Sequence, residues 1–239
     1  MTAASDYVEL IEKRSAGCPV ILTCEHASER LPEPFRFPEG DAWLVGTHWA
    51  YDLGAADLTR ELAGALGAGA ILSRFSRLLI DPNRSPTAPD LFRKIADGRP
   101  VALNEQIGDD ERELRFSMSN AYHAAIDHAL FTDSAKLILS IHSFTPVYEG
   151  TPRAVELGVL FDEETELAES LQGAFVAAGF AALLNEPYSG KFGLMYAVDR
   201  HAKQHGRRAL ELEVRQDLAC DPTVRARIIG VLCRAFSSL

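Results

Sequence analysis

The stretch Pro19–Ser28, with the sequence PVILTCEHAS, constrains the fold more than any other part of this chain. It opens with an unbroken run of apolar or β-favouring residues, which is typical of a strand buried in a parallel sheet. Glu25 and His26 follow that run directly. Charged and polar residues placed there lie at the carboxyl end of a strand, where open α/β sheets form their ligand crevice.

The same pattern returns once, in Lys136–Phe144, where the apolar run KLILSIHSF ends in His142. A lone histidine is usually a surface residue or a hydrogen-bonded core residue. Two histidines that follow apolar strands of one sheet are better explained as ligands, because parallel strands present their carboxyl ends at a common edge. The pair His26 and His142 therefore predicts a metal site.

The hydrophobic periodicity along the rest of the chain predicts alternating strands and helices. The expected strands are Pro19–Cys24, Gly69–Ser73, Leu78–Asp81, Leu137–Ile141, Val155–Phe161, Phe180–Leu184 and Ala209–Val214. The expected helices are Tyr7–Lys13, Asp52–Leu66, Ala102–Phe131, Glu163–Ala178, Leu194–His205 and Pro222–Phe236. This order predicts a three-layer α/β/α fold with a mixed, mostly parallel sheet, in a single domain over residues 1–239.

Composition restricts the partners and the compartment. A formal net charge of −10 argues against nucleic acid, which requires clustered lysine and arginine. The four cysteines lack CxxC spacing and are expected to be reduced thiols. The chain begins with a polar segment and has no apolar run near the ~20 residues of a membrane span, so we expect a cytoplasmic protein.

A catalytic zinc ion needs a third protein ligand besides the two histidines, with one position left for water. Glu29 offers the short His-x-x-Glu spacing, whereas Asp52 opens the next helix and can face the same edge of the sheet. Both candidates remain open on spacing alone. Glu25 is a further acidic neighbour, which can hold His26 in its ligating tautomer.

Hydrolysis also needs a general base that removes a proton from water. Glu213 is the preferred candidate, because it lies at the tip of the late strand ALELEVR. Glu211 shares its strand face and is the second choice. The alternative for Glu213 is a carboxylate that faces solvent.

Several other polar residues follow predicted strands or occupy turns. Arg84 and Arg215 can bind an anionic substrate with paired hydrogen bonds, or instead form internal salt bridges, for example Asp81 with Arg84. Asn83 can orient a substrate carbonyl. Further candidates are His201, as proton donor or oxyanion stabiliser, and the loop residues Tyr188 and Ser189, which can close over a ligand.

Six motifs occur in an order and spacing that resemble the N-formylglutamate amidohydrolase family. They are CEHAS, HWAYDLGAADLTRELA, SRLLIDPNR, SIHSF, PYSG and the late HA…LELEVRQDL, and they extend from about Cys24 to Leu218. The family is similar to the zinc carboxypeptidases and the zinc-dependent N-acetylmuramoyl-L-alanine amidases. The resemblance implies a carboxypeptidase-like fold, a bound zinc ion and hydrolysis of an amide C–N bond.

By position, the resemblance makes His26, Asp52 and His142 the zinc ligands and Glu213 the base. It also assigns substrate binding to Asn83, Arg84 and Arg215. One departure concerns the segment Glu25-His26-Ala27-Ser28, where members that act on formylglutamate have Pro-His-Ser/Ala-Gly. Amide hydrolysis is compatible with this difference, but the acyl group and the amino acid stay open.

The expected substrate is therefore a small anionic N-acyl amino acid such as N-formyl-L-glutamate. Two alternatives are a hydrolase of peptidoglycan fragments or peptides that uses the same zinc centre, and a binding protein that has lost catalysis. The intact Glu213 argues against the binding protein.

Overall fold

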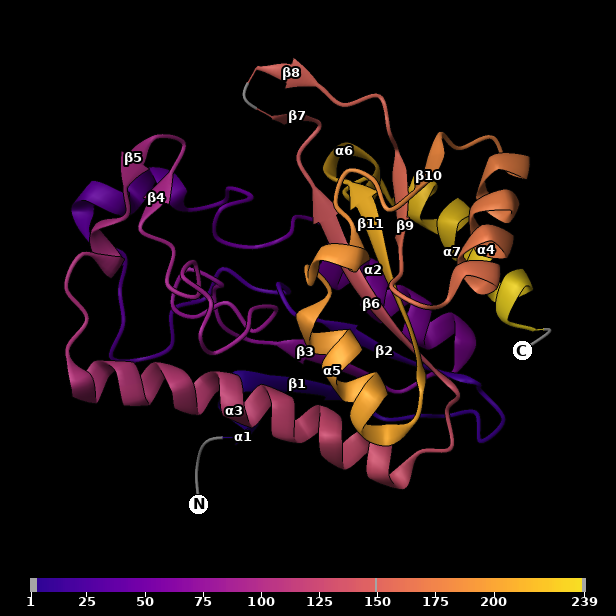
Figure 1. Cartoon of the computed structure of the whole chain (residues 1–239), viewed down its shortest axis with the longest axis horizontal. Helices are drawn as coiled ribbons and strands as arrows, with labels where there is room; N and C mark the ends of the chain where they lie inside the picture. Colours follow the sequence, from indigo (N-terminus) through magenta and orange to yellow (C-terminus); the bar gives the residue numbers. More distant parts are fainter. Residues whose placement is uncertain (1–3, 149, 238–239) are drawn as a thin grey trace.

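A seven-stranded sheet forms the centre of the computed structural model, which describes residues 4–148 and 150–237 (Figure 1). In spatial order the strands are β1 (Val8–Ile11), β3 (Ala70–Ser73), β2 (Val20–Cys24), β6 (Leu137–Phe144), β11 (Arg208–Arg215), β9 (Leu157–Leu160) and β10 (Ala182–Leu184). Among the described strand pairs of this sheet, β1–β3 and β11–β9 are antiparallel and the others are parallel. The predicted mixed, mostly parallel sheet is confirmed.

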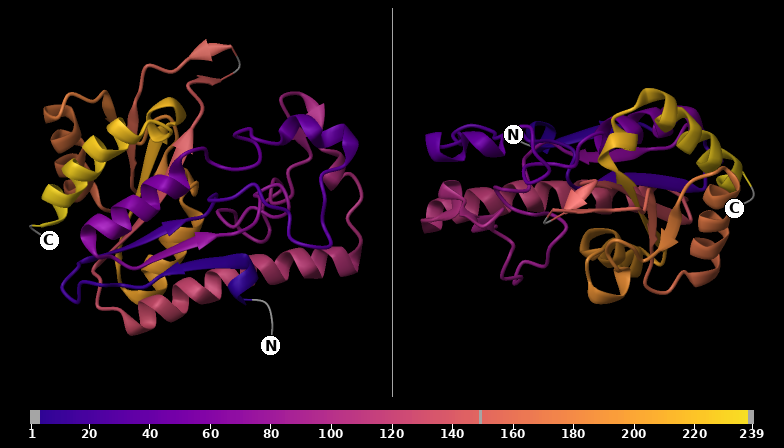
Figure 2. Two further views of the ribbon diagram at one scale, coloured as in Figure 1. Left: turned by 180° about the vertical axis from the view of Figure 1, so that it is seen from behind. Right: turned by 90° about the horizontal axis from the view of Figure 1, so that it is seen from above.

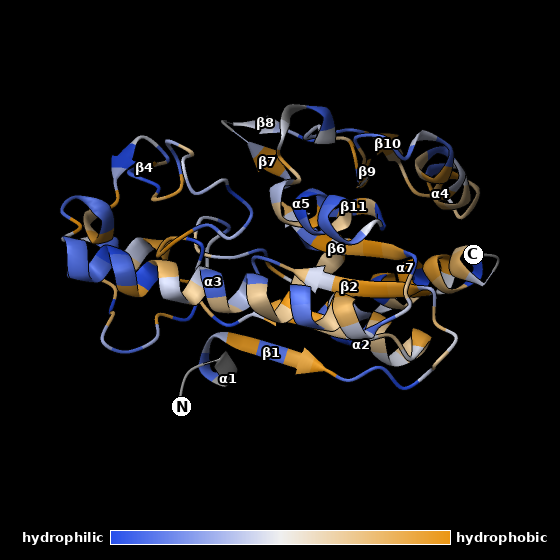
Figure 3. Ribbon diagram, turned by 60° about the horizontal axis from the view of Figure 1, so that its bottom comes forward, coloured by the Kyte–Doolittle hydropathy of each residue, from blue (hydrophilic) through white to orange (hydrophobic). Residues whose placement is uncertain are grey.

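Helices cover both faces of this sheet (Figure 2). One face carries α2 (Ala55–Leu66), α4 (Thr165–Ala177) and α7 (Pro222–Phe236), and the other carries α3 (Asp109–Thr132) and α5 (Tyr196–His205). Alternation along β2 divides its side chains, so that Val20 and Leu22 enter the first core and Ile21 enters the second. Most of β2 and β6 is hydrophobic, as expected of central strands (Figure 3).

The remaining elements are short. They are α1 (Ala4–Tyr7), α6 (Gln216–Ala219), three 3-10 turns (Glu39–Leu44, Ala102–Asn104 and Gly190–Phe192) and the hairpins β4 (Ile95–Ala96) with β5 (Arg99–Pro100) and β7 (Val147–Tyr148) with β8 (Thr151–Pro152). Within the described ranges, no helix is long and apolar enough to cross a membrane.

Two predicted elements are wrong. The helix expected over Tyr7–Lys13 is mainly the edge strand β1, because its backbone pairs with β3 from Val8 to Ile11. The strand expected over Leu78–Asp81 is an irregular segment. Its apolar side chains are buried, but its backbone bonds to a loop, since the Asp81 amide donates to the Leu91 carbonyl. Burial alone therefore does not identify a strand.

Gly158 in β9 provides a test of how this sheet supports the loop after β10. A Cβ added at Gly158 would lie 2.0 Å from the Glu186 carbonyl oxygen, just before Pro187 and Tyr188. We predict that Gly158→Ala lowers the free energy of unfolding by about 1–3 kcal/mol, because strand or loop must move. Urea denaturation measures the change.

Gly173→Ala in α4 is the matched control, because a Cβ there meets nothing within 4 Å. It should leave the free energy of unfolding unchanged or raise it by up to about 1 kcal/mol, the helix propensity difference. Equal effects of the two substitutions would contradict the packing argument.

Candidate active site

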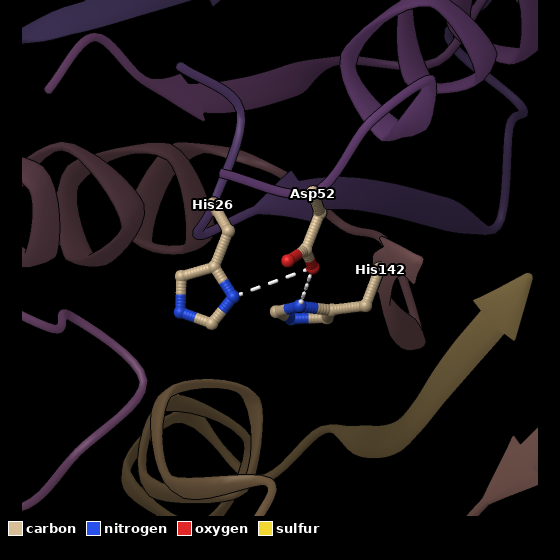
Figure 4. Close-up of side chains that lie close together, drawn as sticks. All are labelled: His26, Asp52 and His142. Atoms are coloured by element: carbon tan, nitrogen blue, oxygen red, sulfur yellow. Dashed lines mark hydrogen bonds and ion pairs between the residues drawn. The ribbon is translucent and has the colours of Figure 1, made fainter. Parts of the chain in front are cut away.

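His26, Asp52 and His142 converge at one edge of the sheet (Figure 4). The Nδ1 atoms of His26 and His142 lie 3.3 and 2.8 Å from the same oxygen, Oδ2 of Asp52. The two rings meet edge to face, with centroids 4.8 Å apart. All three side chains are buried. Two imidazole nitrogens and a carboxylate oxygen are one of the donor sets that catalytic zinc ions use.

Local structure explains this convergence. β2 and β6 are neighbouring parallel strands, so His26, just past the end of β2, lies beside His142 within β6. Asp52 comes from the segment before α2, and its amide donates to the His26 carbonyl at 2.9 Å. The Ser143 amide in turn donates to Asp52 Oδ2 at 3.2 Å. Backbone hydrogen bonds therefore fix the carboxylate between the two rings.

Each histidine also contacts a second carboxylate through its other ring nitrogen. His26 Nε2 lies 2.7 Å from Asp81 Oδ1, and His142 Nε2 lies 2.9 Å from Glu25 Oε2. Both carboxylates are ionised, since the pKa of Asp81 is well below its usual range and that of Glu25 is about 2. The Nε2–H groups therefore donate, and Nδ1 of each ring is the atom that faces Asp52.

This arrangement corrects the expected partner of Glu25. The carboxylate holds His142 rather than His26, and it also accepts hydrogen bonds from Tyr122 and Ser140. The carboxylate that instead holds the His26 ring is that of Asp81. Strand alternation explains the difference, because Glu25 turns toward the face of the sheet covered by α3, which carries Tyr122.

Negative charge is concentrated at this site. Five buried carboxylates belong to it, those of Glu25, Asp52, Asp81, Glu211 and Glu213. Arg77 balances part of their charge, at 2.7 Å from Asp81 and 3.5 Å from Asp52. Burial alone would lower the pKa of His142, but Glu211, Asp52 and Glu25 together raise that pKa well above its usual range. The site therefore favours a positive charge between the imidazoles and Asp52.

Glu213 lies in a cavity of about 360 Å³ that His26, Asp52 and His142 also line. Its Oε2 is buried without a hydrogen-bond partner among the described residues. Burial, together with the neighbouring carboxylates of Glu211 and Asp52, raises the pKa of Glu213 to about 8, although His142 opposes the shift. A carboxylate of raised pKa, with one oxygen unpartnered and a candidate metal site beside it, has the properties of a general base.

The other predicted site residues divide into two groups. Asn83, Arg84 and Tyr188 line the cavity. The Asn83 amide donates to Glu211 at 3.4 Å and to the Leu194 carbonyl at 3.1 Å, so it is held against the late strand. The alternative ligand Glu29 is not part of the three-residue cluster, and it accepts a hydrogen bond from the Gly46 amide.

Arg215, His201 and Ser189 are not among the residues that line the cavity. Arg215 pairs with Asp217 and donates to the Arg153 and Val155 carbonyls. His201 is buried on α5 beside Asp127, and the Ser189 hydroxyl accepts from the Lys191 amide. These three side chains were predicted to belong to the active site, but they do not line the cavity.

Sequence reasoning missed several cavity residues. Arg77 precedes Asp81 by four positions in an irregular segment, so no periodic pattern indicated its direction. Arg153 enters the cavity from beyond β8, where its guanidinium stacks on Phe144, Tyr148 and Tyr188. The sequence does offer one signal for Arg153, which is an arginine in a loop between two strands.

Comparisons with known proteins show the family of this chain and agree with its fold. A model of the N-formylglutamate amidohydrolase family matches residues 18–220. The chain therefore belongs to this family of hydrolases that act on amides, and the resemblance based on the six motifs is confirmed. No significant match was found among the curated proteins.

Two solved structures share the fold over nearly the whole chain. The gene product Atu2144 from Agrobacterium tumefaciens is 29% identical with a TM-score of 0.89, over 98% of this chain and 95% of that one. The N-formylglutamate amidohydrolase from Ralstonia eutropha JMP134 is 17% identical with a TM-score of 0.75, over 98% of both chains.

The pKa of Glu213 predicts how stability depends on pH in the metal-free protein. The folded protein retains the proton up to pH 8, whereas the unfolded chain releases it near 4.5. The free energy of unfolding therefore falls as the pH rises between these two values, by about 1.4 kcal/mol per pH unit. Glu213→Gln should abolish this loss, so the variant becomes progressively more stable than the wild type across that window.

Urea denaturation at a series of pH values in the presence of a chelator measures this difference. Glu169→Gln, which removes an exposed carboxylate from α4, should follow the wild type at every pH. Parallel curves for the wild type and Glu213→Gln would show that the buried carboxylate titrates as it does in the unfolded chain.

Proposed function

We propose that this protein is a zinc-dependent hydrolase that cleaves the amide C–N bond of a small N-acyl amino acid, with N-formyl-L-glutamate as the first candidate. One observation carries the proposal. Nδ1 of His26 and Nδ1 of His142 face the same oxygen of Asp52, while both Nε2–H groups donate to other carboxylates. Such contacts require a positive charge between nitrogen and oxygen, either a proton or a metal ion.

The donor set fits zinc in type and in supporting contacts. Imidazole and carboxylate ligands with hydrogen-bonded outer partners are typical of catalytic zinc sites. His26, Asp52 and His142 would hold the ion, with Asp81 and Glu25 orienting the rings. A zinc ion bound there would supply Lewis acidity and lower the pKa of a water molecule toward ~7.

Glu213 would act as the base. Beside a bound metal ion the Glu213 carboxyl would be ionised, although its pKa is raised in the metal-free protein, because a nearby positive charge lowers the pKa of a carboxyl group. Its unpartnered Oε2 would then be available to take a proton from the attacking water and to pass it to the leaving amine. Asn83, fixed by the Ala197 amide and by Glu211, lies in the same cavity and can orient the substrate. The cavity volume suits a small ligand.

The arginines in the cavity support an anionic substrate. Arg84 already pairs with Asp90, at 3.0 Å. Arg153 has no carboxylate partner in the part of the chain that the structure describes, and it donates only to neutral oxygens of Thr145 and Tyr188. A guanidinium held by aromatic rings and lacking a counter-charge is available to bind a substrate carboxylate. Arg153 thus takes the role that the sequence suggested for Arg215.

The main test of this function is Glu213→Gln assayed on N-formyl-L-glutamate and other N-acyl amino acids. Turnover should fall by at least about 100-fold, the typical contribution of a general base, while the bound zinc is retained. Zinc content and product formation are measured on the same preparation.

Glu29→Gln is the matched control, and it should keep both zinc and turnover because Glu29 bonds to the Gly46 amide outside the cluster. Retained turnover in Glu213→Gln would remove Glu213 from the role of base. Saturable binding without product in the wild type would instead identify an inactive binding protein.

Arg153→Gln tests the recognition of the substrate carboxylate. Loss of a charged hydrogen bond of about 1.5–3 kcal/mol should raise KM roughly 10- to 100-fold for the anionic substrate. KM for the corresponding α-amide should change little. Arg60→Gln, which removes an exposed ion pair with Glu9 remote from the cavity, is the control. An equal rise in KM for the acid and the α-amide would show that Arg153 does not bind the α-carboxylate.

A further inference from the structure

A second cluster of imidazole and carboxylate groups lies between α3 and α5, away from the residues that line the cavity. Asp127 Oδ1 lies 2.8 Å from Nδ1 of His201 and 2.9 Å from Nε2 of His205. These three atoms are all within 4.8 Å of one another, as in the first cluster. Two imidazole nitrogens again face a single carboxylate oxygen.

The sequence explains why the two histidines meet. His201 and His205 are four residues apart in α5, which places them on one face of the helix. The His-x-x-x-His spacing on a helix is the one that zinc sites use. Asp127 belongs to α3, which packs along α5 (Figure 1). The two adjacent helices thus supply the three protein ligands expected of a zinc site.

A hydrogen bond to His123 orients the His201 ring for metal binding. Nε2 of His201 lies 2.9 Å from Nδ1 of the buried His123. Burial lowers the pKa of His201, and burial with the neighbouring His201 lowers that of His123 to about 3, so both rings are neutral at neutral pH. When Nε2 of His201 donates to His123, its Nδ1 lone pair faces Asp127, and neutral imidazole is the ligating form.

We propose that Asp127, His201 and His205 form a second divalent metal site, with zinc as the preferred ion. His201 binds through Nδ1 and His205 through Nε2, and His123 orients His201. Asp127 and His205 are partly exposed, so water can complete the coordination. The ion links α3 to α5.

Such a link also affects the cavity, because the first turn of α5 holds Asn83, which lines the cavity. The Ala197 amide, near the start of α5, donates to Asn83 Oδ1 at 3.0 Å, and Asn83 contacts Glu211. A metal ion that fixes α5 on α3 therefore restrains the helix that positions Asn83. This site is independent of the proposed function, since it shares no ligand with the first cluster.

Zinc stoichiometry after dialysis, measured by elemental analysis, tests the proposal. The wild type should bind one zinc ion at each cluster, whereas Asp127→Asn and His205→Ala should each lose one. His128→Ala, which removes an exposed histidine next to Asp127, should retain both. Zinc should also raise the Tm of His142→Ala by about 5 °C or more, and leave that of His142→Ala/His205→Ala unchanged.

The variants separate the two sites. The wild type could bind a single zinc ion that is lost in His205→Ala and kept in His142→Ala. That result would support the second site and refute the proposed active-site metal. If His142→Ala binds no zinc, or His205→Ala retains the full wild-type content, the second site is refuted.

Discussion

Buried negative charge at the carboxyl ends of β2, β6 and β11 is the constraint on which the rest of the structure depends. Five carboxylates are withdrawn from water there, close to Arg77 and two imidazoles. Burying charge without compensation is costly, so each carboxylate is held by specific partners, such as Tyr122 and His142 at Glu25. Glu213 differs, because its Oε2 lacks a hydrogen-bond partner among the described residues. In the proposed catalysis this oxygen accepts the proton of the attacking water.

The sheet order makes this concentration of charge possible. β2, β6 and β11 are adjacent and parallel, so segments more than a hundred residues apart contribute to one edge. Glu213 lies in register with His142 across the β11–β6 pair, which sets the distance between the proposed base and the proposed ligand. The helices on both faces pack against the apolar side chains of these strands and so hold the sheet in place. Function here follows from strand order as much as from the identity of the residues.

Much of the sheet and the central cluster could be predicted from the sequence, because buried parallel strands are long apolar runs and a histidine at such a run stands out. His26 and His142 were recognised in this way, and Asp52 was one of two candidates on spacing alone. The partner of Glu25 could not be predicted, because it depends on which strand lies beside β2, and that strand is β6, which carries His142. Arg153 and His201 depend on loop paths and helix contacts that leave no periodic signal.

Anomalous diffraction at the zinc edge, from crystals grown with zinc, tests the central claim most directly. The account predicts a peak about 2.0–2.2 Å from Nδ1 of His26, Nδ1 of His142 and a carboxylate oxygen of Asp52. The choice of ring nitrogen is decisive, because the hydrogen bonds of both Nε2 atoms leave only Nδ1 free to bind. A peak on the Nε2 side of either ring, or no peak between the three residues, would contradict the account.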